Sequence, residues 1–383
     1  MIKQISIFNA QFESLVESIN EADGKYVIRT HDDRFFLFGE NSVSLLNRLE
    51  TATANEIEED EEQRLAHFIE KVLLPKGIYQ TKGARVTYKP KKPTLSLHFE
   101  ILNASMVNQL CKGLVWLFIP LVVLSVGLIS LVAHVSYFTS HLHVFSYEYI
   151  LSYTPIELAT ILVLSLITSF FHELGHASCC KRLSGKAGGI GFGMNFFIPV
   201  FYANVSNLHI LPRSKKAAIA ISGIYLQFAV ATLFILLEPY FPAVEKYLVL
   251  NLIGICFNLI PFFRNDGYWL LNDLSKKDDL LSETFSRMKR LDNIEVIHVI
   301  YALLLVTFFA VSFALMANFS LFRGPDIIEQ LLNQSIYSFS AYLKGGLVLL
   351  HYLVIAISLF LLIRHVGNLI ILKFRNLLIS EAN

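Results

Sequence analysis

The stretch TSFFHELGHASCCKRLSG, residues Thr168–Gly185, closes an apolar run that is long enough to span a lipid bilayer. A helix needs about 20 apolar residues to cross hydrocarbon, where every backbone polar group must be satisfied within the segment. Ionisable side chains at that depth are costly and are kept where they have a function. The stretch therefore predicts a membrane helix with a chemical site near one end.

The composition agrees with a membrane protein. Hydrophobic residues make up 54% of the 383 residues and charged residues only 16%, whereas a soluble domain has about 25% charged residues. A net charge of +1 argues against a nucleic-acid partner, which requires a basic surface. The N-terminus lacks an apolar core of signal-peptide length, so we expect no cleavage there. Without a Gly-rich phosphate-binding motif, the chain is not expected to use ATP.

Six apolar segments have the length of a membrane span, and short loops rich in Lys and Arg alternate with loops that are poor in them. By the positive-inside rule, this alternation predicts a multi-pass protein with both termini in the cytoplasm. The six segments are Gly113–Phe138, Tyr149–Phe170, Ala217–Leu237, Tyr247–Phe263, Val296–Ala317 and Gly346–Ile363.

The segment Ala187–Asn207 is apolar but interrupted by glycines. Both of its ends lie on the cytoplasmic side by the charge count, so it cannot be a spanning helix. Irregular backbone at membrane depth is tolerated only against protein or a wet cavity. We expect a re-entrant hairpin that lines the active site; a short loop resting on the cytoplasmic surface is the alternative.

Residues 1–85 predict a small, winged-helix-like α+β domain in the cytoplasm. The runs KYVIRT and RFFLF form a hairpin joined at His31–Asp33, and ENSVSLLNRLE and EEDEEQRLAHFIEKVL have helical spacing. The exposed strand edge beside a helix could capture an extended peptide, although a plain cytoplasmic cap fits the pattern equally well.

A connector (86–111), the membrane domain (112–376) and a cytoplasmic tail (377–383) follow this N-terminal domain. The fold class is thus mainly α.

The motif His172-Glu173-Leu174-Gly175-His176 places two imidazoles four residues apart, on one face of a helix. Such a pair can bind Zn²⁺, and the carboxylate beside the first imidazole is placed to take a proton from a water that the metal activates. Two interfacial histidines that bond to neighbouring helices are the alternative.

A catalytic zinc requires a third protein ligand, and Asp266 lies at a matching depth after the fourth apolar segment. Asn258 and Pro261 interrupt that helix, and Gly267 permits a sharp turn that would bring Asp266 inward. The alternative is that Asn265-Asp266-Gly267 is an ordinary loop turn. His141 and His143, in an outer loop, are either a weak metal site or solvated surface.

The two motifs together, His172–His176 and Asn258-Leu-Ile-Pro261 with Asp266-Gly267, resemble the signatures of the site-2 protease family of intramembrane zinc metalloproteases. The resemblance covers about residues 113–273. It implies Zn²⁺ on His172, His176 and Asp266, Glu173 as general base, and Asn258 near the reacting carbonyl.

The resemblance also implies that residues 188–204 present an unwound substrate strand. The residues implied in substrate binding are Gly189, Gly191, Gly193, Asn195 and Asn204. Where relatives have a Gly-Pro…Asn turn, this chain has SGIYLQ, with Gly223 and Gln227.

Residues 1–85 resemble the leader-peptide-binding domains of enzymes that mature ribosomally made peptides. Both halves together are similar to peptide zinc metalloproteases encoded beside small bacterial peptides. This implies a place in the bacterial inner membrane, a peptide or single-span membrane protein as substrate, and a neighbouring peptide exporter as a further partner.

Three functions follow from these patterns. The first is an intramembrane zinc endopeptidase that acts on a small ribosomally made peptide recruited through residues 1–85. The second is the same chemistry in signalling, on a single-span regulator. The third is a non-proteolytic export or immunity component; the intact His172, Glu173, His176 and Asp266 count against it, because such costly polar groups would be lost without a function.

Overall fold

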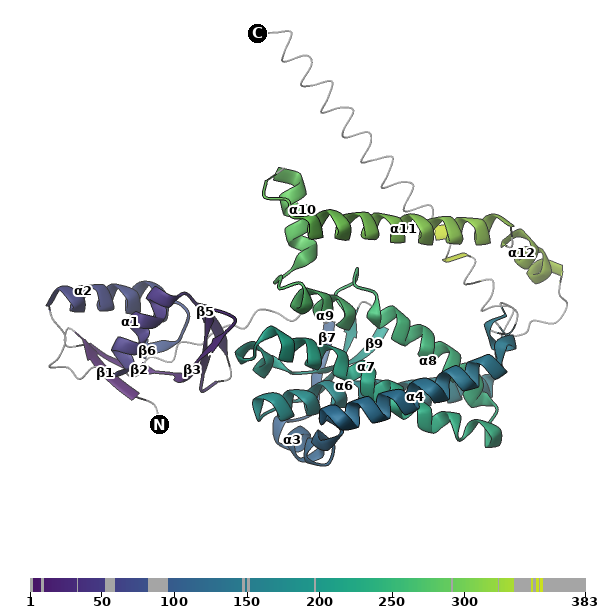
Figure 1. The fold of residues 1–383 in the computed structure, drawn as a ribbon, viewed down its shortest axis with the longest axis horizontal. Coiled ribbons are helices and arrows are strands. Elements are labelled where there is room, and N and C mark those ends of the chain that lie inside the picture. The colour runs from purple at the N-terminus through teal and green to yellow at the C-terminus, as the bar shows by residue number, and fades with distance from the viewer. Residues whose placement is uncertain are drawn as a thin grey trace, which may run out of the picture. The chain divides into compact units, whose positions relative to one another are not determined.

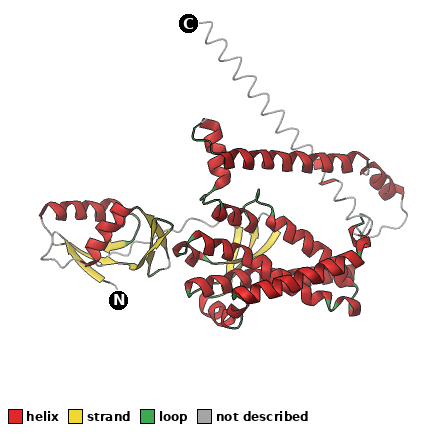
Figure 2. Cartoon of the chain, viewed as in Figure 1, coloured by secondary structure: helices red, strands yellow, loops and turns green. Residues whose placement is uncertain are grey.

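The computed structural model describes residues 3–7, 10–32, 34–51, 59–81, 96–146, 149, 152–195, 198–290, 292–322, 324–333, 346, 349, 350, 352 and 353. The described chain is mainly helical, with three small sheets (Figures 1 and 2). It divides into two units. The first comprises Met1–His134, Ser165–Phe234 and Asn251–Asp278, and the second Val135–Leu164, Ile235–Leu250 and Asp279–Asn383.

The N-terminal part of the first unit contains two antiparallel sheets, with strand orders β1-β2-β6 and β3-β4-β5. The strands are β1 (Lys3–Ile7), β2 (Ala10–Ser14), β3 (Val16–Ala22), β4 (Lys25–Thr30), β5 (Phe35–Phe38) and β6 (Tyr79–Thr81). The helices are α1 (Glu40–Thr51), α2 (Glu59–Phe68) and the π-helical turn η1 (Ile69–Leu73). The predicted runs KYVIRT and RFFLF are β4 and β5; the other four strands were not anticipated.

One of the unanticipated turns has a clear sequence signal. Asp23 and Gly24 join β3 to β4 with φ angles of 54° and 72°. Positive φ at both central residues is the type I′ arrangement, for which Asp-Gly is a preferred pair in two-residue hairpins. The stretch EADGKY therefore encodes a hairpin immediately before the one that we predicted.

The hydrophobic core of this part forms where α1, α2 and η1 cover the sheets. Leu46, Leu65, Ile69 and Leu73 from the helices are fully buried, as is Ile28 from β4. Their spacing of three and four residues along the helices produces the apolar face that was read from the sequence.

Among the described residues, four helices are long and apolar enough to cross a membrane: α4 (Pro120–Ser140), α6 (Pro155–Ser184), α7 (Arg213–Ile235) and α11 (Val296–Phe322). The segment predicted around residues 247–263 forms the shorter helix α8 (Ala243–Leu259). Most of the sixth predicted segment, Gly346–Ile363, and the tail 377–383 lie outside the described residues. The count of six spans therefore stays a prediction.

Two of these helices begin later than predicted, and both begin at a proline. Pro120 opens α4, and Pro155 opens α6. Proline is favoured at the first helical position because its missing N–H would have no partner there. At α6, Glu157 Oε2 accepts from Thr154 N at 2.6 Å and Thr154 Oγ1 accepts from Glu157 N at 3.3 Å. This capping box fixes the start of the helix.

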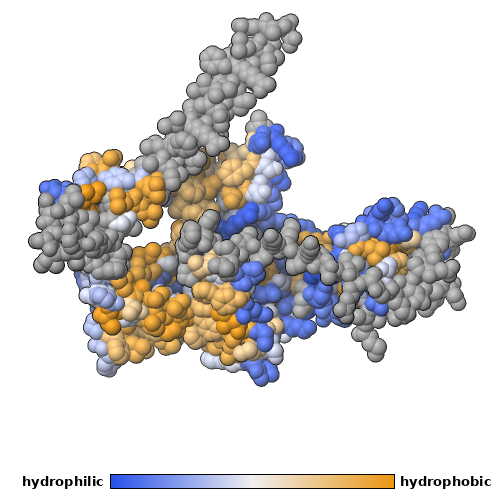
Figure 3. Space-filling view, turned by 180° about the vertical axis from the view of Figure 1, so that it is seen from behind, coloured by the Kyte–Doolittle hydropathy of each residue, from blue (hydrophilic) through white to orange (hydrophobic). Residues whose placement is uncertain are grey.

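The long helices expose apolar side chains in quantity. Leu121, Leu124 and Leu128 on α4 are 72%, 68% and 58% exposed. Figure 3 shows broad apolar (orange) surface over the helices, whereas the described N-terminal elements are mainly hydrophilic. Apolar patches of this extent on monomers mark membrane or partner contacts.

The predicted re-entrant segment forms a β-hairpin of β8 (Ile190–Asn195) and β9 (Ile198–Ala203). Residues expected to be a connector supply a third strand, β7 (Ser96–Leu102), and the order is β7-β8-β9. The helix α3 (Ala104–Lys112) follows β7. The depth of the hairpin in a membrane stays a prediction.

The other described helices connect or follow these elements. They are η2 (Val115–Phe118), η3 (Leu142–Phe145), η4 (Ser206–Ile210), η5 (Glu238–Tyr240), α9 (Asp266–Leu274), α10 (Leu280–Arg290) and α12 (Gly324–Asn333).

Gly175 allows α6 and α7 to touch at their backbones. A Cβ atom at this position would lie 2.5 Å from the carbonyl oxygen of Ser222 and 3.0 Å from the Cα of Gly223. Side chains of any size would therefore push α7 away from the histidines of α6.

We expect Gly175→Ala to destabilise the protein by about 1–3 kcal/mol, because overpacking a close contact forces backbone shifts. Gly127→Ala is the matched control, since a Cβ there meets nothing within 4 Å, and alanine favours a helix over glycine by about 1 kcal/mol. Thermal unfolding in detergent should show a lower midpoint for Gly175→Ala alone. Equal midpoints would contradict the proposed close packing.

Candidate metal centre

Helix α6 presents its two motif histidines to α7 from the same face. His172 and His176 are buried, and their Nε2 atoms are 3.0 Å apart. This is the geometry that the spacing of four residues predicts for a helix.

The carboxylate of Asp266 reaches both imidazoles from α9. Its Oδ2 lies 2.9 Å from His172 Nε2, and its Oδ1 lies 3.4 Å from His176 Nε2. The chain reverses sharply between the end of α8 and this residue. A Cβ at Gly267 would lie 2.2 Å from the carbonyl oxygen of Leu259, so only glycine permits this turn. The Asn265-Asp266-Gly267 sequence is thus a turn that also delivers a carboxylate to the histidines.

Both histidines are held by hydrogen bonds at their other ring nitrogen. His176 Nδ1 lies 2.8 Å from the carbonyl oxygen of Ile219, which can only accept, so this nitrogen carries the proton. His172 Nδ1 lies 2.9 Å from Gln227 Oε1, and Gln227 Nε2 in turn donates to Asn251 Oδ1 at 2.8 Å. In neutral rings, both Nε2 lone pairs therefore face Asp266 and each other.

This cluster fits a metal ion. Two imidazole lone pairs and two carboxylate oxygens are all acceptors, so a cation is the group that satisfies them together. Ligands at about 2.0–2.1 Å from a tetrahedral zinc are about 3.3 Å from one another, close to the 2.9–3.4 Å observed here. His172, His176 and Asp266 would hold the ion and leave a fourth position open.

Glu173 lies beside the cluster and lines a cavity together with His176 and Asp266. Its Oε2 accepts a hydrogen bond from the backbone N–H of Ala203, at the end of β9, at 2.7 Å. The carboxylate is therefore oriented by the hairpin that follows α6 in sequence.

Gly223 supplies the space that the cluster needs, and sequence reasoning noted it only as a departure from a pattern. A Cβ at this position would lie 2.3 Å from His176 Nε2 and 2.8 Å from His172 Nε2. Gln227 and Asn251 were likewise not assigned a role. The spacing of four residues from Gly223 to Gln227 on an apolar helix matches that of the histidines, and this was the available signal.

A cavity of about 540 Å³ opens beside the cluster. Glu173, His176 and Asp266 line it from the helices, and Val27 and Leu37 line it from the sheet β3-β4-β5. The hairpin tip of this sheet contacts the start of α7 and the loop that follows α9. Asp23 accepts from the backbone N–H of Arg213 at 2.9 Å, and Lys25 pairs with Asp278 at 2.7 Å.

The wall of the cavity carries charges of both signs. Arg213 pairs with Asp278 at 2.7 Å. Burial raises the pKa of the Asp273 carboxyl to about 6, even though Lys216 and Arg213 lie near enough to oppose this shift. Asp273 is therefore mostly ionised at pH 7 and becomes neutral at mildly acidic pH.

The other predicted site residues are placed less distinctively. Asn258 is half-buried near the end of α8 and is not among the described residues that line the cavity. A Cβ at Gly189 would collide with Glu100 of β7, and one at Gly191 with the ring of Tyr202. These two glycines are thus required by packing within the sheet.

Gly193 and Asn195 lie in β8, beside β9, and the structure assigns them no further role. Asn204 Oδ1 accepts from Ser206 N at 3.1 Å and from Ser206 Oγ at 2.7 Å. Its side-chain oxygen is therefore engaged in a local turn, and the substrate-binding role of these residues stays a prediction.

The chain is similar to one curated protein. It is 24% identical over 115 residues to "Putative peptide zinc metalloprotease protein YydH" of Bacillus subtilis (strain 168). The match covers 29% of this chain and 46% of that protein, so it spans about half of the relative's length. No family model and no solved structure match the chain. The similarity agrees with a metalloprotease and leaves the substrate undetermined.

We expect Gly223→Ala to abolish zinc binding at this cluster, because its methyl group would occupy the space at the two Nε2 atoms. Gly254→Ala, in α8, is the control, since a Cβ there meets nothing within 4 Å. Metal analysis of the purified proteins should show about one zinc fewer in Gly223→Ala and in Asp266→Ala, and no loss in the control. Full zinc content in both Gly223→Ala and Asp266→Ala would contradict the site.

Proposed function

We propose that the protein is an intramembrane zinc endopeptidase that cleaves a small, ribosomally made bacterial peptide in the inner membrane. The observation that carries this proposal is the convergence of His172, His176 and Asp266 with Glu173 beside them. Two histidines and one carboxylate are the ligands of a hydrolytic zinc site. Such a site also has an open coordination position and a neighbouring general base.

When bound, zinc would polarise the scissile carbonyl and lower the pKa of a water. The protein's own residues would manage position and protons. Glu173 would accept the proton of the attacking water at its carboxylate and pass it to the leaving amine. Gln227 and the Ile219 carbonyl would keep both imidazoles in the tautomer that presents Nε2.

The edge of β9 supports binding of an extended substrate. Asn204 N–H bonds back to Gly189 O, so Asn204 faces β8, whereas the N–H of Ala203 points to Glu173. Since neighbouring residues of a strand direct their backbone groups to opposite sides, Phe201 also faces the unpaired side. A peptide that adds to this edge as a strand would pass directly over Glu173.

A second edge strand, β5, supports recruitment of a longer precursor. Thr30 N donates to Arg34 O, and this bond fixes which residues of β5 direct their backbone groups toward β4. Phe36 and Phe38 therefore pair with β4, and the N–H groups of Phe35 and Leu37 lie on the open side. Leu37 is 64% exposed and lines the same cavity as Glu173. A leader segment on β5 would thus leave the cleaved segment within reach of the site.

Replacement of Glu173 by Gln tests the chemistry. We expect Glu173→Gln to retain zinc and to capture substrate. Its turnover should fall by about 10²–10⁴-fold, because the amide cannot take the proton. The assay is cleavage of a candidate precursor peptide by the purified protein, with metal content measured on the same sample. Loss of zinc in Glu173→Gln would make Glu173 a ligand, and unchanged cleavage would exclude it as the base.

Leu37→Pro tests recruitment, because proline removes an outward N–H without removing a bond to β4. One lost main-chain hydrogen bond corresponds to about a threefold to tenfold weaker affinity. We expect KM for the full precursor to rise by that factor while kcat, and cleavage of a leaderless peptide, stay unchanged. Leu37→Ala, which keeps the N–H, is the control. If Leu37→Pro cuts precursor like the parent protein, a single-span regulator becomes the better substrate.

A further inference from the structure

The second unit contains another cluster of metal-ligand side chains, formed by His141, Glu238 and Glu245. One ligand atom from each residue lies within 4.8 Å of the other two. All three side chains are half-buried, so they are held in place and not freely solvated. We propose that this cluster is a second zinc site, separate from the candidate catalytic centre and with a structural role.

The three residues come from different segments of the unit. His141 directly follows α4, Glu238 begins η5 after α7, and Glu245 lies in the first turn of α8. An ion bound by all three would tie these segments together. Because zinc binds the folded cluster and not the separated segments, it would stabilise this arrangement.

The imidazole of His141 is oriented for a metal. Its Nδ1 lies 2.8 Å from the carbonyl oxygen of Tyr137, so Nδ1 carries the proton in the neutral ring and Nε2 keeps its lone pair. A hydrogen bond from the second ring nitrogen to a carbonyl is the usual support of a metal-binding histidine.

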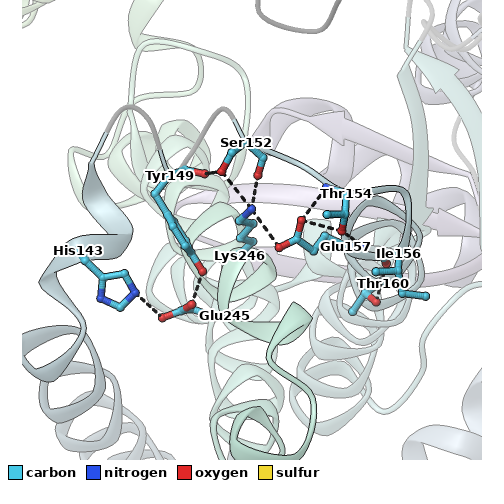
Figure 4. A network of polar contacts seen from close by, with 9 residues as sticks. All are labelled: His143, Tyr149, Ser152, Thr154, Ile156, Glu157, Thr160, Glu245 and Lys246. Carbon is cyan, nitrogen blue, oxygen red and sulfur yellow. Dashed lines mark hydrogen bonds and ion pairs between the residues drawn. The ribbon is translucent and has the colours of Figure 1, made fainter. Parts of the chain in front are cut away.

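Glu245 is also oriented by its neighbours, as Figure 4 shows. Tyr149 donates its hydroxyl to Glu245 Oε2, and His143 Nε2 lies 3.1 Å from Glu245 Oε1. The His143 side chain is 58% exposed and already contacts a ligand of the cluster, so a small rotation would let it serve as a fourth ligand. Two imidazoles and two carboxylates form a set that suits zinc.

In the part of the chain that the structure describes, no lysine or arginine forms an ion pair with the carboxylates of the cluster. Lys246 is the closest candidate in sequence, but its Nζ pairs with Glu157 Oε1 at 3.0 Å and donates to the Ser152 carbonyl (Figure 4). Two partly buried carboxylates that approach one another repel, and a dication between them removes that repulsion.

The test is a zinc count on the purified full chain and its variants. We expect about two zinc ions in the parent protein and about one in Asp266→Ala, which keeps only the second site. Glu238→Gln, which preserves shape, should also hold about one, and the double variant Asp266→Ala with Glu238→Gln should hold none. His67→Ala, at an exposed histidine of α2, is the control and should keep both ions.

Affinity gives an independent readout. Zn²⁺ titrated into chelator-stripped Asp266→Ala against a chromophoric chelator should bind at one site, and Glu238→Gln or His141→Ala in that background should weaken this binding at least about tenfold. Zinc should also raise the unfolding midpoint of Asp266→Ala but not that of the double variants. Should His141→Ala fail to fold, Glu238→Gln decides. Absence of any zinc site in Asp266→Ala, or equal affinity in Glu238→Gln, would overturn the proposal.

Discussion

The organisation of the first unit depends on one electrostatic constraint, which is that four acceptor atoms converge in a buried place. The Nε2 atoms of His172 and His176 and both oxygens of Asp266 lie within 2.9–3.4 Å of their nearest neighbours in the cluster. Acceptors without a donor between them are unfavourable when buried, and a cation reverses the sign of that interaction. The surrounding structure is best understood as the support that keeps these atoms in place.

That support comes from backbone approaches that only glycine allows. Gly175 brings α7 against α6, Gly223 leaves room at the imidazoles, and Gly267 lets the chain turn beneath Leu259. Each position is intolerant of a methyl group, and together they bring α6, α7 and α9 to one point. Hydrogen bonds from Gln227 and Ile219 then fix the rings. The ligands can therefore take these orientations only because the helices approach one another this closely.

Local patterns predicted a considerable part of the chain. The spacing of His172 and His176, the runs that became β4 and β5, and the apolar character of α4, α6, α7 and α11 were all visible in the sequence, because each depends on neighbours within a few residues. Helix starts were less accurate, since Pro120 and Pro155 were overlooked as first helical residues. The strand β7 was missed because its partner β8 is about ninety residues away.

The sequence by itself determined a membrane-type helical protein with a histidine pair on one helix face, since hydropathy and the helical period are properties of consecutive residues. It also named Asp266 as a third ligand beside that pair. Only the tertiary structure decided that Gln227, Gly223 and Ala203 surround that cluster, and that His141, Glu238 and Glu245 form another. These groups meet through the packing of separate helices and a hairpin edge, and no spacing along the chain encodes distances between segments that are tens of residues apart.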